Sequence, residues 1–220
     1  MRWLLLAPLA ACAIAPPPPY SPDDYFRDLG EAHCLRMTEC CTRSEYTDWW
    51  TADSTGDMYS CLQAHQNPAE RPWIERGLKH GSIAFDIAAA HDCVAALEQL
   101  ACTDFEPAIR FRETYCISPF VGTVGDGGPC SADAECIGTT CRITDTAMHT
   151  GVCESRVPDG ATCDPTESCA LGDNCQYPGV CALGLPANSE CATDYQCADD
   201  WCKGSGFLVK GHCVRACNGQ

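Results

Sequence analysis

The sequence predicts a small, mostly α-helical N-terminal domain followed by disulfide-rich repeats of loops and short β-hairpins with little regular secondary structure. Three observations predict this fold class. The chain of 220 residues contains 21 cysteines, a content typical of a disulfide scaffold. Apolar residues with helical spacing are confined to residues 21–120, and a unit of four cysteines recurs three times in residues 121–220.

Residues 1–11 have the composition of a signal peptide. Arg2 is followed by an apolar stretch that is too short to span a bilayer, which needs about 20 apolar residues. The segment Leu9-Ala10-Ala11-Cys12 resembles the lipobox of bacterial lipoproteins, in which the cysteine receives a lipid and the chain is cut just before it. The resemblance implies a lipid on Cys12 and attachment to the outer membrane or the cell surface. Cleavage after Ala13, which would give a secreted protein, is the alternative.

Residues 12–20 are predicted to be a proline-rich tether. Residues 16–19 are all proline, which favours polyproline II. At about 3.1 Å per residue, they would hold the folded part roughly 12 Å from the membrane.

Residues 21–120 are predicted to form the helical domain. Helix starts are indicated at Ser21, at Asn67-Pro68 and at Asp86, where a capping side chain precedes proline, acidic residues or an apolar run. Gly81 is expected to end the second of these helices, and residues 82–85 are expected to be extended.

The helical domain contains seven cysteines, all of which are expected to form disulfides: Cys34, Cys40, Cys41, Cys61, Cys93, Cys102 and Cys116. Adjacent Cys40 and Cys41 are expected to take different partners, because a bond between neighbouring residues strains the peptide.

The C-terminal part contains three cysteine-rich repeats, at about 126–156, 157–184 and 185–217. Asp-Gly pairs at residues 126 and 159 are expected to mark turns at the start of the first two repeats. A unit of about 30 residues cannot bury a core large enough to fold alone, so two disulfides per repeat are expected to replace that core. Spacing does not choose among the three possible pairings. The repeat region contributes these disulfide-forming residues: Cys130, Cys136, Cys141, Cys153, Cys163, Cys169, Cys175, Cys181, Cys191, Cys197, Cys202, Cys213 and Cys217.

Cysteine parity predicts a link between the two parts of the chain. Three repeats of four leave Cys217 over, and the helical domain has an odd number of cysteines. If each repeat pairs internally, Cys217 is expected to bond to the helical domain and fold the array back onto it. A shifted pairing, in which Cys116 enters the first repeat, is the alternative. Zinc is the competing use for the cysteines, but no Cys-x2-Cys knuckle is present, so no metal or other cofactor is expected.

Two resemblances agree with this organisation. The spacing Cys-x5-Cys-x4-Cys followed by Gly-x-Cys, in residues 130–153 and 191–213, resembles the Dickkopf N-terminal cysteine-rich domain of secreted animal proteins that modulate Wnt receptors. The order of lipobox, helical domain with residues 85–97, and residues 120–127 leading into the repeats is similar to that of cysteine-rich lipoproteins of myxobacteria. These resemblances imply a fold and a cell-surface location and imply no particular activity.

Charge and motifs restrict the possible functions. The net charge of −16 argues against a nucleic-acid partner and against direct contact with anionic lipid headgroups. The sequence lacks a Gly-x-Ser-x-Gly elbow, a His-Glu-x-x-His helix and a phosphate-binding glycine loop, so no catalytic residue is expected. Trp49, Trp50 and Trp201 are the candidate binding residues, either as an exposed binding face or as packing over disulfides.

The sequence favours a non-enzymatic envelope lipoprotein, anchored in the membrane at Cys12. It would act as a disulfide-stapled structural module or bind an envelope or extracellular protein or glycan. The alternative is an inhibitor of a protease or another hydrolase, with the segments Arg142–Gly151 and Lys203–His212 as inhibitory loops. An enzyme housed in the helical domain is the third and weakest hypothesis.

Overall fold

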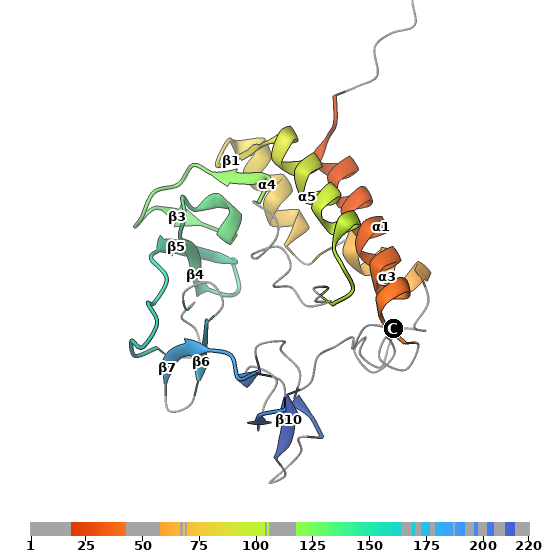
Figure 1. Cartoon of the computed structure of the whole chain (residues 1–220). Helices are drawn as coiled ribbons and strands as arrows, with labels where there is room; N and C mark the ends of the chain where they lie inside the picture. Colours follow the sequence, from red (N-terminus) through yellow and green to blue (C-terminus); the bar gives the residue numbers. More distant parts are fainter. Residues whose placement is uncertain are drawn as a thin grey trace, which may run out of the picture.

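The structure is a computed structural model. It describes residues 19–42, 58–66, 68, 70–103, 105, 118–163, 169, 173–176, 179–186, 188–191, 196–197, 202–204 and 210–213. The candidate residues outside these ranges are Cys12, Trp49, Trp50, Cys116, Trp201 and Cys217. Within the described ranges, a helical N-terminal region precedes small antiparallel sheets, which confirms the coarse features of the predicted fold class (Figure 1).

The N-terminal region contains four described helices: α1 (Pro22–Cys40), α3 (Met58–Gln66), α4 (Arg71–His80) and α5 (Ile87–Gln99). The start of α1 agrees with the prediction. The Ser21 hydroxyl accepts a hydrogen bond from the Asp24 amide at 3.2 Å, and the Asp24 carboxylate accepts one from the Ser21 amide at 3.0 Å. This reciprocal capping box satisfies two amides that the helix itself leaves unpaired. None of the helices in the described residues is long and apolar enough to cross a membrane.

The predicted end of α4 and the predicted start of α5 are also observed. Gly81 ends α4 in the left-handed conformation, with φ of 76°, which a residue without a Cβ adopts at no steric cost. Asp86 caps α5 by accepting a hydrogen bond from the Ala89 amide at 3.1 Å. Helix α4 itself begins at Arg71, later than the start indicated at Asn67-Pro68; Glu70 before it makes no side-chain capping bond, and Asn67 lies outside the described residues. Helix α3 has no counterpart in the prediction, and the disulfide Cys34–Cys61 links it to α1.

The helices share one hydrophobic core. Its buried members are Tyr25, Phe26, Leu29, Ala32, Cys34, Met37, Cys40, Cys41, Cys61, Ile74, Ile83, Ala90, Cys93, Leu97, Phe105 and Phe120. The ring of Phe120 stacks on that of Phe26 at 5.4 Å and meets that of Tyr25 edge-on at 5.7 Å. Because Phe120 follows the helices in sequence, this aromatic cluster attaches the start of the repeat region to α1.

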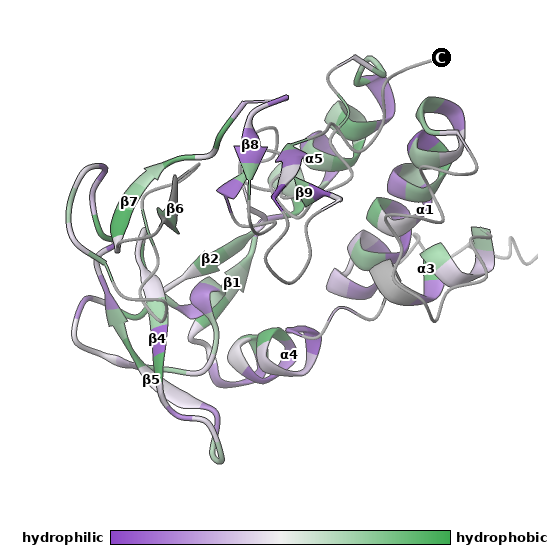
Figure 2. Ribbon diagram, turned by 90° about the horizontal axis from the view of Figure 1, so that it is seen from below, coloured by the Kyte–Doolittle hydropathy of each residue, from purple (hydrophilic) through white to green (hydrophobic). Residues whose placement is uncertain are grey.

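A two-stranded sheet joins the helices to the repeats. Strand β1 (Ile83–Phe85), in the segment predicted to be extended, pairs antiparallel with β2 (Phe120–Gly122). Strand β2 therefore spans the position at which the sequence places the domain boundary. Strand β1 contacts α4, and β2 contacts the short 3-10 helix of residues 133–135 in the first repeat. Figure 2 shows α4 close to this pair.

The repeats contain only short strands. The first has β3 (Pro129–Cys130), the 3-10 helix η1 (Asp133–Glu135), β4 (Thr140–Asp145) and β5 (Thr150–Glu154); the second has β6 (Asp173–Gln176) and β7 (Val180–Leu183); the third has β8 (Glu190–Cys191), β9 (Cys202–Lys203) and β10 (Gly211–Cys213). The sheet orders are β3-β5-β4, β6-β7 and β8-β10-β9, all antiparallel. In Figure 1 the repeats follow one another along an arc that starts beside α4.

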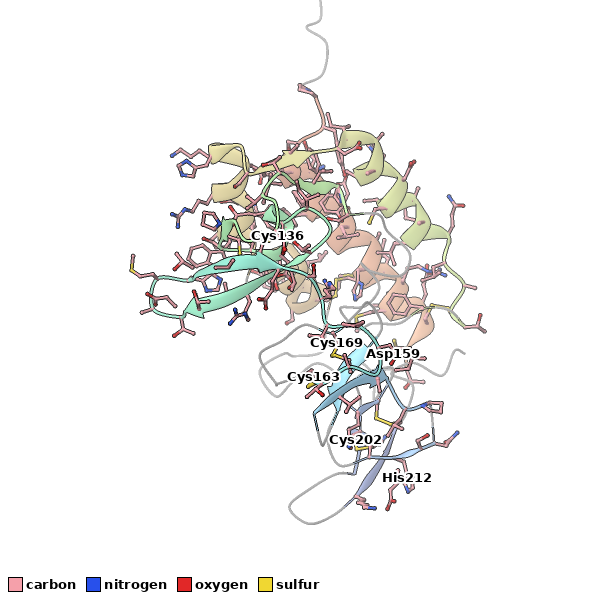
Figure 3. All side chains as sticks on the ribbon, turned by 90° about the vertical axis from the view of Figure 1, so that its left-hand side faces the viewer. Cys136, Asp159, Cys163, Cys169, Cys202 and His212 are labelled. Carbon is pink, nitrogen blue, oxygen red and sulfur yellow. A yellow bond between two sulfur atoms is a disulfide. The ribbon has the colours of Figure 1, made fainter. Side chains whose placement is uncertain are left out.

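The three repeats have the same disulfide order, first cysteine to third and second to fourth. The bonds are Cys130–Cys141 and Cys136–Cys153, Cys163–Cys175 and Cys169–Cys181, and Cys191–Cys202 and Cys197–Cys213. Each repeat packs these cysteines against one aliphatic side chain before its first cysteine: Val124, Val157 or Leu185. Disulfides therefore form most of the core of each repeat (Figure 3).

The repeats also share a turn. A residue in the left-handed region donates its amide to the carbonyl of the repeat's last cysteine: Gly127 to Cys153 at 2.8 Å, Gly160 to Cys181 at 2.8 Å, and Asn188 to Cys213 at 2.7 Å. The first two are the glycines of the predicted Asp-Gly turns. Asparagine, which tolerates this conformation better than most residues, takes the position in the third repeat.

In the helical region, Cys34 bonds to Cys61 and Cys40 bonds to Cys102. Cys41 and Cys93 are disulfide-bonded as well. Neighbouring Cys40 and Cys41 therefore have different partners. The first repeat uses its own four cysteines, so Cys116 does not enter that repeat.

Candidate binding surface

Of the two loops that the sequence singles out, Arg142–Gly151 is fully described. It comprises the last four residues of β4, the turn after it and the start of β5. Lys203–His212 is described only at its two ends, and the three candidate tryptophans lie outside the described residues. The structure therefore shows the complete geometry of the first loop only.

The turn between β4 and β5, residues 145–150, is here named the hairpin tip. One Asp145 carboxylate oxygen accepts hydrogen bonds from the amides of Ala147 at 2.9 Å and Met148 at 3.0 Å. An aspartate that bonds the backbone two residues onward fixes a turn locally. At its base, the Thr144 hydroxyl donates to the Thr150 carbonyl at 3.3 Å. The tip thus has a defined conformation, and it leaves the Met148 side chain 67% exposed.

A ring stack fixes the hairpin tip to the helical region. His149 lies on Trp73 of α4, with ring centroids 4.2 Å apart and planes inclined by 14°. His149 has φ of 49°, a left-handed conformation that is uncommon for a residue with a side chain. Trp73 is predicted from sequence only as an apolar helix residue. Its partner is distant in the chain, so no local pattern indicates the stack.

A buried carboxylate forms the second connection between α4, β1 and the first repeat. Glu135 is 8% exposed. One of its oxygens accepts a hydrogen bond from the Ser82 hydroxyl at 2.6 Å, and the other accepts from the backbone amides of Ser131 and Ala132. Ser82 also accepts a backbone bond from the Thr123 amide at 3.0 Å. The first repeat is therefore held against the helical region by polar contacts as well as by Phe120.

The residues with shifted pKa values lie together at the start of α1. Hydrogen bonds from the Ser21 side chain and backbone and from Arg27 lower the pKa of the half-buried Asp24 carboxyl. Burial and the hydrogen bond that the Tyr20 hydroxyl donates to Asp28 raise the pKa of Tyr20. Carboxylates beside Arg27 raise its pKa. These shifts arise from a helix cap and surface ion pairs, an arrangement that stabilises the start of the helix.

Three of the described histidines are engaged in packing, whereas His80 and His212 are exposed. His33 is buried in α1 with its ring 5.4 Å from that of Phe105. The ring of His91 lies 4.1 Å from that of Tyr20, and His149 stacks on Trp73. Each of these three histidine rings therefore packs against an aromatic neighbour.

Sulfur atoms cluster in each repeat. Three of them come within 4.8 Å of one another in each of these sets: Cys130, Cys136 and Cys141; Cys163, Cys169 and Cys181; and Cys191, Cys197 and Cys202. All are bonded in disulfides. Since the thiolate is the form of cysteine that binds metal, these clusters act as cross-links in the oxidised protein.

No protein-family model, curated protein or solved structure matches the chain.

Proposed function

We propose that the protein is an exported lipoprotein, anchored at Cys12 to the outer membrane or cell surface, and that it acts there as a non-enzymatic, disulfide-stapled binding or structural module. Its partner would be an envelope or extracellular protein or glycan. The tether of residues 12–20 would hold the folded part away from the lipid.

The observation that carries this proposal is the disulfide core of the repeats. Cys153, Cys181 and Cys213 are almost completely buried, and each packs in a core made mainly of cysteines. Such a core forms where thiols oxidise, which indicates an oxidising compartment. Bacterial export with a lipid on Cys12 would deliver the chain to one. The cross-linked repeats supply rigid loops, which suit binding because little conformational entropy is lost on contact.

The test is the intact mass of the natively expressed protein after partition between detergent and water. The expected product partitions into detergent, has the mass of residues 12–220 plus acyl groups, and gains about 20 Da on reduction as its disulfides take up hydrogen. The Cys12→Ser variant is the control: it should stay in water with the same gain on reduction. A wild-type product that lacks acyl groups and starts beyond Cys12 would contradict the anchor, and free thiols would contradict the scaffold.

The hairpin tip supports a second candidate function, inhibition of a protease or another hydrolase. An exposed Met148 on a turn with fixed hydrogen bonds is a side chain that could enter an enzyme's specificity pocket. The disulfides at the base of β4 and β5 would keep the loop in place after contact.

A panel of extracellular hydrolases tests this alternative. If the tip inhibits, Met148→Ala should weaken inhibition by about 30-fold, the effect of losing a contact of about 2 kcal/mol. Leu183→Ala is the matched control, since Leu183 is a similarly exposed apolar residue in the second repeat, at 69%. An equal loss in both variants, or no inhibition by the wild-type protein, would count against the tip.

A further inference from the structure

One helix carries an arginine and a lysine that the rest of the described structure does not engage, with a histidine beside them. Arg76, Lys79 and His80 of α4 are exposed and make no hydrogen bond or ion pair with any described residue. The remaining described arginines and lysines all have partners: Arg27, Arg36, Arg71, Arg142 and Lys210 pair with carboxylates, Arg156 donates to a carbonyl, and Lys203 is also engaged.

These three side chains share one side of the helix. Arg76 precedes Lys79 by three residues and His80 by four, the spacings that bring side chains together on a helix surface. We name this group the α4 cationic face. Basic residues in the last turn stabilise a helix end, which accounts for Lys79 and His80 but not for Arg76, one turn earlier. Glu75 precedes Lys79 by four residues, a spacing that favours the helix, and it also pairs with Arg71 at 2.7 Å. Arg76 and Lys79 repel each other at their spacing, so helix stability does not account for Arg76.

The α4 cationic face lies at the end of the molecule from which the tether leaves. Arg71, in the first turn of α4, pairs with Asp23 in the first turn of α1. Tyr20, the last residue of the tether, is fixed to α1 by its hydrogen bond to Asp28 at 3.0 Å. Arg76 is five residues beyond Arg71, about 7.5 Å along the helix axis. In Figure 1 the described chain begins at the top of the view, where α4 and β1 also lie.

We propose that the α4 cationic face binds the phosphate headgroups of the membrane that carries the lipid anchor. This contact would orient the protein with α4, and the hairpin tip that packs on its Trp73, beside the bilayer. This proposal rests on the lipid anchor of the proposed function. The guanidinium of Arg76 and the ammonium of Lys79 match phosphate oxygens in charge and hydrogen bonding.

The net charge of −16 makes this orientation selective. An anionic surface repels most of the protein, so the described face with unpaired cations is the one that can approach it. The contact need not be strong by itself, because the anchor keeps the face near the headgroups at high effective concentration. A salt-sensitive orientation is therefore expected, and not an independent affinity for membranes.

The lysines allow a direct footprint. The chain has three: Lys79 on the α4 cationic face, and Lys203 and Lys210 in the third repeat. The lipidated full-length protein would be reconstituted on vesicles of phosphatidylcholine, alone or with about one third phosphatidylglycerol, and the rate of lysine acylation followed by mass spectrometry. On the anionic vesicles, acylation of Lys79 should slow several-fold, and that of Lys203 and Lys210 should not change. Raising the salt concentration should abolish the difference, because ions screen the attraction.

Charge reversal provides the matched comparison. Arg76→Glu retains Lys79 as the reporter and should remove most of its protection, whereas Lys210→Glu makes the same charge change in the third repeat and should leave the protection intact. Equal acylation of wild-type Lys79 on both vesicle types would overturn the proposal. Dextran sulfate added to the protein on neutral vesicles provides a second check. If it slows acylation of Lys79 as much as anionic lipid does, the proposal is overturned and an acidic polysaccharide is identified as the partner. Failure to float with either vesicle would instead refute the lipid anchor.

Discussion

At the scale of single residues, the joint between the helical region and the first repeat depends on side chains that fit no local pattern. Glu135 is buried because three donors from two segments converge on its carboxylate. Gly122 allows strand β2 to lie close to the backbone of residues 135 and 136. A Cβ at this position would lie 2.5 Å from the carbonyl oxygens of Glu135 and Cys136. Neither residue lies in a stretch with a periodic apolar pattern, so the sequence alone does not predict that these positions are buried.

Glu135→Ala should lower the free energy of unfolding by about 2–3 kcal/mol, because hydrogen bonds to a charged group are lost and buried amides are left without an acceptor. Glu135→Gln has nearly the same shape: its carbonyl oxygen can accept from Ser131 and Ala132, and its amide can donate to Ser82. Its expected cost is about 1 kcal/mol or less. Urea denaturation with the disulfides intact measures both free energies of unfolding. A loss of less than about 1 kcal/mol in Glu135→Ala would show that the carboxylate contacts contribute little.

The capping box predicts a specific dependence on pH. The pKa of Asp24 in the folded protein is lowered from its ordinary value of 3.8, chiefly by hydrogen bonds from Ser21. A carboxyl with a depressed pKa stabilises the fold above that ordinary value, and the contribution is lost as the pH falls through the folded pKa. Below pH 4, stability should therefore decline less steeply in Asp24→Asn than in the wild-type protein. Urea midpoints across this range test the slope, and Asp92→Asn, at an exposed position of α5, is the control.

At the scale of elements, helix starts and turns were predictable because their signals are local. Ser21 with Asp24, Asp86 with Ala89, and Gly81 each act within one turn of the chain. Helix α3 lacks such a signal. It is linked to α1 by the disulfide Cys34–Cys61, which is a tertiary contact. The attachment of the hairpin tip to α4 is tertiary as well, because Trp73 and His149 belong to different parts of the chain.

Replacing Trp73 with alanine should release the hairpin tip. The lost ring contact has a value of about 0.5–1.5 kcal/mol beyond its burial, so amide hydrogen exchange at residues 144–150 should become several-fold faster. Trp73→Phe keeps an aromatic ring and should retain most of the protection. The disulfides at the base of the hairpin are unaffected, so exchange at Cys141 and Cys153 serves as an internal control. Unchanged exchange at the hairpin tip would mean that the hydrogen bonds of Asp145 and Thr144 keep the tip in place without the ring stack.

At the scale of the whole molecule, covalent links decide which parts stay together. All eight described disulfides lie within the helical region or within one repeat. Contact between the helical region and the first repeat comes instead from β1 with β2, from Phe120 and from Glu135. The helices and the first repeat therefore form one packed unit that continues past the boundary expected from composition.

Cys217 is predicted to close the molecule by bonding to Cys41. The Cys93 sulfur lies 3.4 Å from the Tyr25 hydroxyl, and the Tyr25 ring contacts Phe120. Cys116 precedes Phe120 by four residues, a span of at most about 14 Å, so it is the expected partner of Cys93. Peptide mapping without reduction should then find Cys93 linked to Cys116 and Cys41 linked to Cys217. Cys93 linked to Cys217 would contradict this assignment but preserve the fold-back, and a free Cys217 would contradict both.

The amino-acid sequence alone determined the oxidised, repeat-based character of the protein and the positions of most helix ends. Cysteine spacing, caps and Asp-Gly turns are local features, and their physical effects do not depend on distant residues. Only the tertiary structure decided the order of pairing within each repeat, the burial of Glu135, the stack of His149 on Trp73 and the isolation of the α4 cationic face. Each of these depends on which distant segments pack together, because sulfur atoms bond only when the fold brings them within reach, and a charge is unpaired only when no distant carboxylate arrives beside it.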